Sequence, residues 1–492
     1  LVMNMNDEMM TESRPLLAHV GDVVEEGKER DQMQSQSTTE QQQQKQKRIE
    51  EEREPKRELS SVGASINMFK LLLGAGLLAL PRAFSNSGLM AGALLFGVLG
   101  LLCWFTQLLL LWSKDAAIQR GISPHRVQTY AGLGEVALKG GFGRWVLTIS
   151  VSTLQLLFCS AYVLVISRTL HSYIPGLPHW AAAVVMMPVL LLLASIHWIQ
   201  NLTFVSAFGI IVYVCGVIGM TSYFAIKSIS HGGVPVEDVV WSRLPLFIGS
   251  SLYCLEGING TLPIAGGMKN PKNAPGALLV ALMTFSIVGA GFASLGYAAG
   301  FSTAAGGVVI NALPQGIPKI IVEWALAAAL LCTHPLQLFP AREIIEEHVI
   351  SILFPSHSSS ISSSSSSSSS STTSLPPISM SSMSSIKKDS RLNFKLKHKR
   401  AIEIVIRSII RFVLVGITCA IGAAVNDFGP FADVVGSFFL GFAGFILPSV
   451  IYLRMIGFGH SIGSRAIAIG SVLTLLGGLV FMVIGGYAAI TQ

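Results

Sequence analysis

The chain has 492 residues, of which 51% are hydrophobic and 12% are charged, whereas an average soluble domain has about 25% charged residues. Apolar runs of about 20 residues, the length that crosses a bilayer as a helix, recur along most of the sequence. This composition excludes a soluble globular protein and predicts an all-α polytopic membrane protein that lies in a lipid bilayer. The net charge of +7 follows the loops between these runs, so it does not indicate nucleic-acid binding.

The first 60 residues differ in composition from the rest of the chain. Residues 1–60 are rich in Gln, Glu and Arg and have no apolar periodicity, so we expect a disordered cytosolic tail. Within it, the run from Glu12 to Leu17 (Glu-Ser-Arg-Pro-Leu-Leu) resembles the acidic dileucine signal that sorting adaptors bind on proteins of lysosomes or vacuoles. The alternative is a chance match, because the pattern is short and permissive.

Beyond this tail we expect eleven membrane-spanning helices, eight within residues 61–355 and three within residues 401–492. The expected spans are residues 63–84, 88–113, 145–171, 179–198, 202–228, 244–267, 275–300, 318–345, 403–424, 430–453 and 465–489. Lysine and arginine concentrate in alternate short loops, which places those loops and the N-terminus in the cytosol. An odd number of spans then places Gln492 on the outer or lumenal side.

The loop between the eighth and ninth spans is unusual. Residues 356–385 are almost entirely serine and are followed by a basic run from Lys387 to Arg400. Serine tracts cannot bury enough apolar surface to fold, so we expect residues 356–400 to be a disordered insertion on the cytosolic side. The basic run either binds anionic lipid at the inner leaflet or only enforces the topology.

Two of the apolar runs contain glycine and proline at membrane depth. The first span holds the run from Gly74 to Pro81 (GAGLLALP), and the sixth holds the run from Glu256 to Pro263 (EGINGTLP). Matched interruptions in two halves of a chain point to the substrate site of a transporter, because freed backbone groups in lipid need partners. The alternative is a pair of proline-kinked helices that bind nothing.

The spacing of the two interrupted spans suggests a repeat. We consider that each interrupted span is the first helix of a five-helix half. Because five is an odd number of helices, the two halves then cross the membrane in opposite senses, which gives a 5+5 inverted repeat with one helix outside it. Half-helix N-termini then face a carboxylate and freed carbonyls face an amine, so an amino acid suits the site. The expected substrate-binding residues are Gly74, Ala75, Gly76, Leu77, Tyr162, Tyr253, Glu256, Gly257 and Thr333.

The third span carries a polar stripe on one helical face. Its members recur at spacings of three or four residues and are Thr148, Ser152, Gln155, Cys159 and Tyr162. Polar side chains in lipid face other helices or a cavity, so most of these residues are interpreted as interhelical hydrogen-bond partners. Tyr162, nearest to the outer side, is the candidate for contact with the substrate or for a gate.

Two ionisable residues inside the spans are candidates for carrying a coupling proton. Glu256 has no lysine or arginine near it in sequence, and a carboxylate at that depth must be paired, hydrogen-bonded or protonated. It either exchanges a proton, or holds the first span open for the substrate amine, or braces the two broken helices. His334, beside Thr333 and Gln337 in the eighth span, either titrates or is a packing residue.

The remaining polar positions suggest no further chemistry. Lys70, in the cytosolic half of the first span, is expected to snorkel to the inner membrane surface, and Asp433, near the outer end of the tenth span, to the outer surface. All six cysteines lie in apolar runs, so we expect neither a structural disulfide nor a cysteine-based metal site. No phosphate loop, zinc spacing or nucleophile elbow appears, so we expect no enzyme activity and no bound cofactor.

Several motifs resemble the amino acid/auxin permease family. They are GAGLLALPRAF in the first span, TYAGLGEVALKGGFGRW before the third, LPLFIGSSLYCLEGINGTLPIAGGMKNP around the sixth, THPLQLFPAREIIE in the eighth and FADVVGSFFLGFAGFILPSVIYLR in the tenth. The resemblance covers roughly residues 62–350 and 402–490. It implies eleven helices in a LeuT-like fold and the movement of neutral amino acids with H+ as the coupling ion. Within the family the chain looks closest to vacuolar transporters and animal proton-coupled amino acid transporters.

One position departs from the family. Animal members place a histidine implicated in proton coupling seven residues before the first glycine of the motif, and this chain has Asn67 there. The function predicted is secondary active transport of amino acids at a vacuolar or lysosomal membrane, with the plasma membrane as the alternative location. The competing hypothesis is an amino acid sensor that signals to cytosolic partners, against which the disordered tail argues.

Overall fold

The structure is a computed structural model of the 492-residue chain. It describes residues 59–353 and 382–491, apart from residues 139, 196–198, 232, 302–308, 310–312, 314 and 460. Side chains of α13 are described from residue 402 and those of α8 from residue 208. The predicted tail up to residue 58, with the Glu12–Leu17 motif, and the serine tract up to residue 381 lie outside the described residues.

The described part of the chain is helical, apart from loops and one isolated bridge between Leu59 and Met268. In chain order the elements are α2 (Ser61–Leu72), η1 (Ala75–Ala79), α3 (Leu80–Ser87), α4 (Leu89–Gln119), η2 (Pro124–Val127), α5 (Tyr130–Ala137), α6 (Gly141–Tyr173), α7 (His179–Ala194), α8 (Ile199–His231), α9 (Leu244–Cys254), α10 (Ile258–Gly267), η3 (Pro271–Asn273), α11 (Ala274–Ala298), α12 (Ile317–Leu353), α13 (Ser382–Ala424), α14 (Phe428–Val434), η7 (Val435–Ile446), α15 (Leu447–Met455), α16 (Ile462–Val480), η8 (Phe481–Gly485) and α17 (Gly486–Ile490). Helices satisfy their own backbone groups, which is why apolar runs in a membrane adopt them.

The predicted all-α polytopic class is confirmed. Within the described residues, eight helices are long and apolar enough to cross a membrane, and a ninth span results if α2 and the η1–α3 segment count as one. Each of the eleven predicted spans coincides with helical structure, but α7 has 16 residues and the sixth predicted span is divided into α9 and α10. The count of eleven therefore stays a prediction.

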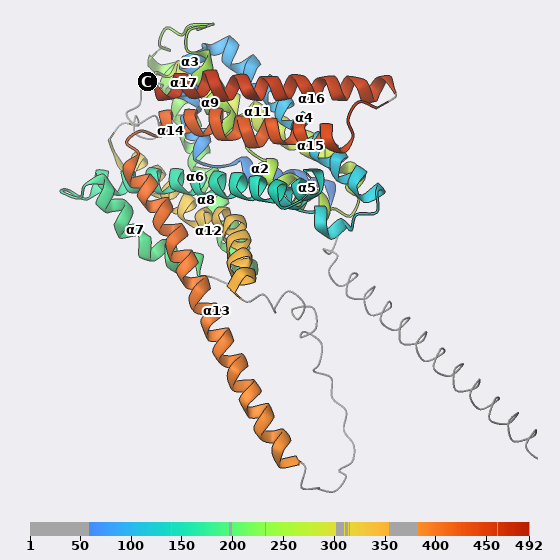
Figure 1. The fold of residues 1–492 in the computed structure, drawn as a ribbon. Helices are drawn as coiled ribbons and strands as arrows, with labels where there is room; N and C mark the ends of the chain where they lie inside the picture. Colours follow the sequence, from blue (N-terminus) through green and yellow to red (C-terminus); the bar gives the residue numbers. More distant parts are fainter. Residues whose placement is uncertain are drawn as a thin grey trace, which may run out of the picture. The chain divides into compact units, whose positions relative to one another are not determined.

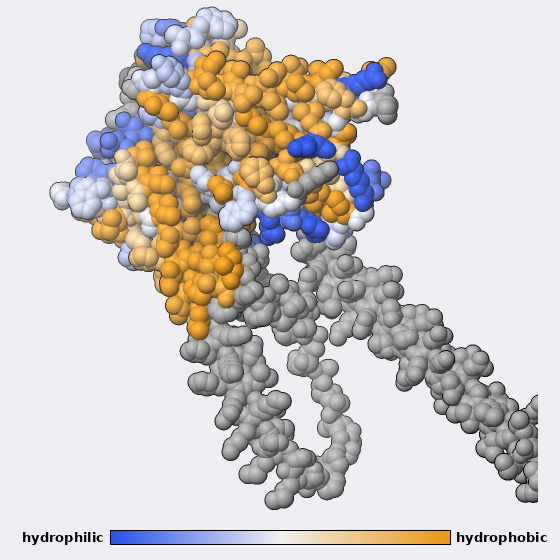
Figure 2. All heavy atoms as spheres, in the orientation of Figure 1, coloured by the Kyte–Doolittle hydropathy of each residue, from blue (hydrophilic) through white to orange (hydrophobic). Residues whose placement is uncertain are grey.

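The surface agrees with a membrane location. Figure 2 shows one face of the molecule as mainly hydrophobic, with hydrophilic residues gathered toward the ends of the long helices in Figure 1. On α16, side chains such as Ile462 and Leu473 are exposed. Exposed apolar side chains on this scale suit contact with lipid tails.

One boundary differs from the prediction. Helix α13 begins at Ser382, so it includes residues 382–400, which the composition assigned to a disordered insertion. Those residues are rich in Lys and Arg, which favour helix, and they run directly into the apolar ninth span. The serine tract before them has no such propensity.

The interrupted spans lie inside the helix bundle. Helix α2 packs against α10 and α11, and α9 packs against α3 and η7. Helix α9 and η7 approach each other closely, because a Cβ on Gly436 would collide with the carbonyl oxygen of Gly249. Only glycine permits backbones to meet this closely, so small residues fix the position of the sixth span against the tenth.

Candidate functional site

The first interrupted span is broken at Leu73 and Gly74. Helix α2 ends at Leu72, Gly74 is extended, and the short helix η1 begins at Ala75. The segment Ala75–Ser87, which contains η1 and α3, is bent by 53° from α2. The Gly74 carbonyl accepts two hydrogen bonds, one of 3.3 Å from the Leu77 N–H of η1 and one of 2.6 Å from the hydroxyl of Tyr213 on α8. The predicted break is therefore present, and a neighbouring helix satisfies its carbonyl.

The sixth interrupted span is broken over residues 255–257. Glu256 is buried there and accepts a hydrogen bond of 3.0 Å from Asn259 Nδ2. The carboxylate precedes the N-terminus of α10, where the helix dipole favours negative charge. This bond stays within the sixth span, so among the described residues Glu256 has no direct hydrogen bond to the first span.

A cavity of about 20 Å³ lies between the two breaks, and we call it the central cavity. It is lined by six of the nine predicted substrate-binding residues, namely Gly74, Ala75, Gly76, Tyr162, Tyr253 and Glu256. The rest of its wall consists of Leu71, Leu72, Phe158, Cys254 and Gln337. A space of this size holds a water, which needs about 10–15 Å³, so an amino acid requires the walls to move apart.

The other three predicted residues lie outside the central cavity. Leu77 is buried in the hydrophobic core, one turn into η1. Gly257 lines a second cavity of about 20 Å³ on another side of Glu256. Thr333 donates a hydrogen bond of 2.8 Å to the Ala329 carbonyl and lines a third, larger cavity. The structure thus brings the two breaks together, but these three residues do not line the central cavity between them.

Gln107, which the sequence analysis did not single out, stands beside Glu256. It is 1% exposed and lines the second small cavity together with Glu256 and Gly257. Its Oε1 has no hydrogen-bond partner among the described residues. A glutamine within the apolar 31-residue helix α4 is the signal that sequence inspection could have used, because polar groups in lipid need a reason to be there.

The third cavity has a volume of about 270 Å³ and lies between α2 and α12. We call it the α2–α12 vestibule, and its wall includes Asn67, Lys70, Leu71, Tyr162, Thr333 and Gln337. Leu71, Tyr162 and Gln337 also line the central cavity. The two cavities therefore adjoin, and these three side chains stand between them.

The polar stripe of the third span has two roles. Gln155 accepts a hydrogen bond of 2.6 Å from Gln337 of α12, and the Cys159 thiol donates to the His334 carbonyl over 3.7 Å. These are the interhelical contacts that the spacing predicted. Tyr162 is the member that reaches the central cavity, where a Cβ on Gly74 would lie 3.1 Å from its hydroxyl.

His334 is fully buried. Neither of its ring nitrogens has a hydrogen-bond partner among the described residues. The ring is not part of the wall of the three cavities above. Its role as a proton carrier stays a prediction.

The snorkelling predicted for Asp433 is wrong. Its side chain is fully buried, forms an ion pair of 3.0 Å with Arg82 of α3 and accepts a hydrogen bond from Ser250 of α9. A carboxylate with two such partners is stabilised inside the bundle, so it has no need to reach the surface. Lys70, for which the same was predicted, lines the α2–α12 vestibule.

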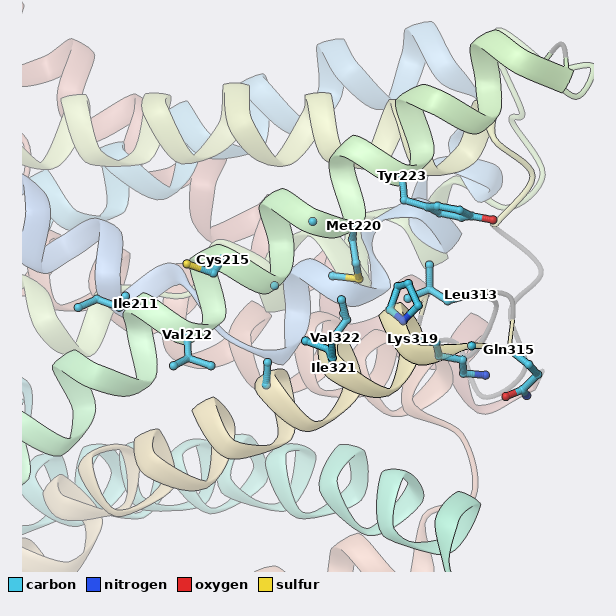
Figure 3. Close-up of a pocket in the computed structure, with 15 residues that line it drawn as sticks. Ile211, Val212, Cys215, Met220, Tyr223, Leu313, Gln315, Lys319, Ile321 and Val322 are labelled. Carbon is cyan, nitrogen blue, oxygen red and sulfur yellow. The ribbon is translucent and has the colours of Figure 1, made fainter.

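A cavity of about 650 Å³ lies between α8 and α12, and Figure 3 shows it. Its wall is mainly apolar, with Gln315, Lys319 and Tyr223 toward one end. Lys319 forms an ion pair of 3.7 Å with Glu323. Neither helix break contributes to this wall.

The proteins that resemble this chain in sequence are amino acid transporters. A profile of the family described as "Transmembrane amino acid transporter protein" matches residues 57–491. The chain is 26% identical to "Amino acid transporter ANT1" of Arabidopsis thaliana over 86% of this chain and 90% of that protein. It is 25% identical to "Vacuolar amino acid transporter 4" of Saccharomyces cerevisiae over 79% of this chain and 52% of that protein, so the match spans about half of the yeast relative.

A likeness to a solved structure concerns the fold alone. A Na+-coupled sialic acid symporter superposes with a TM-score of 0.50 at 11% identity, covering 88% of each chain. The similarity is one of helix arrangement and confirms the predicted LeuT-like fold.

Proposed function

This chain belongs to the transmembrane amino acid transporter family, and we propose that it is a secondary active transporter that moves neutral amino acids together with protons. The observation that carries the proposal is the central cavity, where bare backbone of the first span faces Glu256 of the sixth. Since the family is one of transporters, the chain is not an enzyme.

The chemistry of the central cavity supports an amino acid as the substrate. The backbone N–H groups at the start of η1 suit a carboxylate, and the Glu256 carboxylate suits an ammonium group. Phe158 and Tyr253, whose ring centroids lie 4.7 Å apart, offer an apolar wall to the substrate side chain. Glu256 is the one charged residue of this wall, which favours neutral side chains over charged ones.

Two features support alternating access around this cavity. On one side of the break at Gly74, the α2–α12 vestibule adjoins the central cavity. On the other side, the Arg82–Asp433 ion pair ties the first span to the tenth. We infer that this pair closes the outer path and that it must separate when the protein opens to that side.

Proton coupling is assigned to Glu256. It lines both small cavities and is buried, with Asn259 as its hydrogen-bond donor. When the substrate ammonium binds, it balances the negative charge of the Glu256 carboxylate; when the substrate leaves, a proton can take its place. Because the buried carboxylate is neutralised by one cation or the other, the movements of substrate and proton would be coupled. His334 is the second candidate.

We further propose a vacuolar or lysosomal membrane as the location. The names of the yeast relatives, which are vacuolar amino acid transporters, support this location. The Glu12–Leu17 run would bind the sorting adaptors.

The test is flux into liposomes that contain the purified full-length chain. Radiolabelled amino acids, neutral, acidic and basic, are offered with and without a pH gradient, and empty liposomes are the control. We expect neutral amino acids to accumulate only when a gradient drives them. If no amino acid moves in either direction, the transport proposal is wrong. If the amino acid flux is the same with and without the pH gradient, only the proton coupling is wrong.

A further inference from the structure

Lys70 occupies an unexpected position for a charged residue of a membrane span. It lies in the last turn of α2, four residues before the break at Gly74. Its side chain lines the α2–α12 vestibule, as does Asn67, which precedes it by three residues and shares its helical face. Among the described residues, no carboxylate forms an ion pair with Lys70. An ammonium at this depth is costly unless a cavity or an anion stabilises it.

The vestibule offers acceptors opposite this cation. The Thr333 hydroxyl donates its hydrogen bond to the Ala329 carbonyl, so its oxygen can still accept a hydrogen bond from a ligand. Gln337 donates its amide N–H to Gln155, which leaves its carbonyl oxygen as an acceptor. The vestibule wall thus has a donor cation on α2 and two neutral acceptors on α12.

The rest of the wall is apolar, and the size suits a small ligand. Leu73, Ile210, Ile264 and Leu336 contribute hydrophobic surface. The volume of about 270 Å³ lies just below the roughly 300–1,000 Å³ of pockets that hold drug-sized ligands. Among the described residues of this wall there is no carboxylate, so a cationic side chain would find no partner there.

We propose that the α2–α12 vestibule is a second amino acid-binding site, in which Lys70 binds the α-carboxylate of a neutral amino acid. The ammonium group of the ligand donates to Thr333 and Gln337, and the apolar wall receives its side chain. The inference rests on the proposed function, because it assigns a second position to the same class of substrate.

The α2–α12 vestibule lies on the path that an amino acid would take out of the central cavity. Leu71, Tyr162 and Gln337 are the side chains common to both walls. An amino acid that leaves the central cavity on this side passes between them and meets Lys70 next. Binding there would hold the ligand by its carboxylate once it has left the backbone N–H groups of η1.

The experiment measures binding to the purified full-length chain by the rise in unfolding temperature with ligand. The probes are L-alanine, L-leucine and L-tyrosine, together with isoamylamine, which is leucine without its carboxylate. Lys70→Gln is compared with Lys70→Arg, which keeps the charge. Lys272→Gln, on the same predicted cytosolic side but outside the vestibule wall, controls for the loss of one surface charge.

A charge-assisted hydrogen bond to a carboxylate predicts a loss of about tenfold in amino acid affinity for Lys70→Gln. Lys70→Arg and Lys272→Gln should bind like the wild type. Isoamylamine is a cation, so it should bind no more weakly to Lys70→Gln than to the wild type, because the substitution removes a like charge from the vestibule wall. Because Gly76 belongs to the wall of the central cavity alone, the same loss should persist when Lys70→Gln is made in a Gly76→Ala chain.

Three results would overturn the proposal. They are unchanged amino acid affinity in Lys70→Gln, an equal loss for L-leucine and isoamylamine, and no binding of any amino acid probe to the wild type. Liposome flux, measured in parallel, keeps the two proposals apart. Flux with wild-type affinity in Lys70→Gln contradicts the vestibule site alone, whereas Lys70-dependent binding without flux contradicts transport alone.

Discussion

Gly76 lies where the first span packs closely against the sixth. A Cβ added there would lie 2.9 Å from Cys254 Sγ, 3.0 Å from Tyr253 Cδ1 and 3.2 Å from Cys254 Cα. Since one of these atoms is backbone, the clash cannot be relieved by a rotamer change alone. We expect Gly76→Ala to abolish amino acid uptake while the protein still reaches its membrane, as measured by uptake normalised to membrane abundance.

Two other glycines allow the effect of an added methyl group on uptake to be compared with that at Gly76. At Gly257 the added Cβ would meet the flexible end of Met68, so Gly257→Ala should reduce uptake less than Gly76→Ala. Gly97 of α4 has no atom within 4 Å of an added Cβ, so Gly97→Ala should transport like the wild type. Wild-type affinity and rate in Gly76→Ala would remove this glycine from the site.

Glu256 allows the proton role to be separated from a structural one. Glu256→Gln keeps the shape of the side chain and leaves a carbonyl oxygen to accept the bond from Asn259, but it mimics only the neutral form. A proton carrier should therefore lose pH-driven uptake and still exchange amino acid across the membrane. Unchanged pH dependence would rule out the coupling role. Glu135→Gln, in an exposed pair with Arg126, is the control.

The residues of the site were predictable to different degrees. The breaks follow from Gly74, Gly76 and Gly257, because glycine and proline weaken helices whatever surrounds them. Tyr213 was missed, since its bond to Gly74 joins positions 139 residues apart, and no local pattern reports such a contact. Leu77 was assigned to the site although it is buried in the core, because the path of the chain beyond the break cannot be read from the sequence.

The pairing of α3 with α14 makes a prediction about stability. Arg82 and Asp433 form a 3.0 Å ion pair, and the Asp433 side chain is fully buried. Removing one partner of a buried pair leaves an uncompensated charge, which costs about 3–5 kcal/mol. We expect Arg82→Met to lower the free energy of unfolding by that order, and Arg82→Met combined with Asp433→Asn to recover part of the loss. Denaturant unfolding in detergent measures both.

A second ion pair serves as the control for the first. Arg168 and Asp427 lie 3.3 Å apart, but the Asp427 side chain is 55% exposed. Exposed pairs contribute about 0–1 kcal/mol, so Asp427→Asn should change stability little. Equal losses from the two pairs would contradict the view that burial decides the cost. The sequence could not predict the Arg82–Asp433 pair, because its members are 351 residues apart.

The location of the whole chain depends on its N-terminal tail, where the prediction rests on the sequence alone. Changing Leu16 and Leu17 to Ala should move the protein from the vacuolar or lysosomal membrane toward the cell surface, because adaptors bind the two leucines together. Fluorescence microscopy of a tagged chain measures the shift. Val23 and Val24 changed to Ala give the matched control, and an unchanged location of the leucine variant would make the motif a coincidence.

The topology of the whole chain depends on one short helix. Helix α7 has 16 residues, which at 1.5 Å each is shorter than the roughly 30 Å hydrocarbon core, so it must cross with local thinning of the bilayer or not at all.

If α7 crosses, the span count is odd. A tag at Gln492 should then be reachable only from the outer or lumenal side, and a tag in the serine tract only from the cytosol. Protease protection in sealed vesicles distinguishes the two sides, and a detergent-treated sample shows that each tag is cleavable. If both tags report the cytosol, the eleven-span count is wrong, and α7 is the first helix to remove from it.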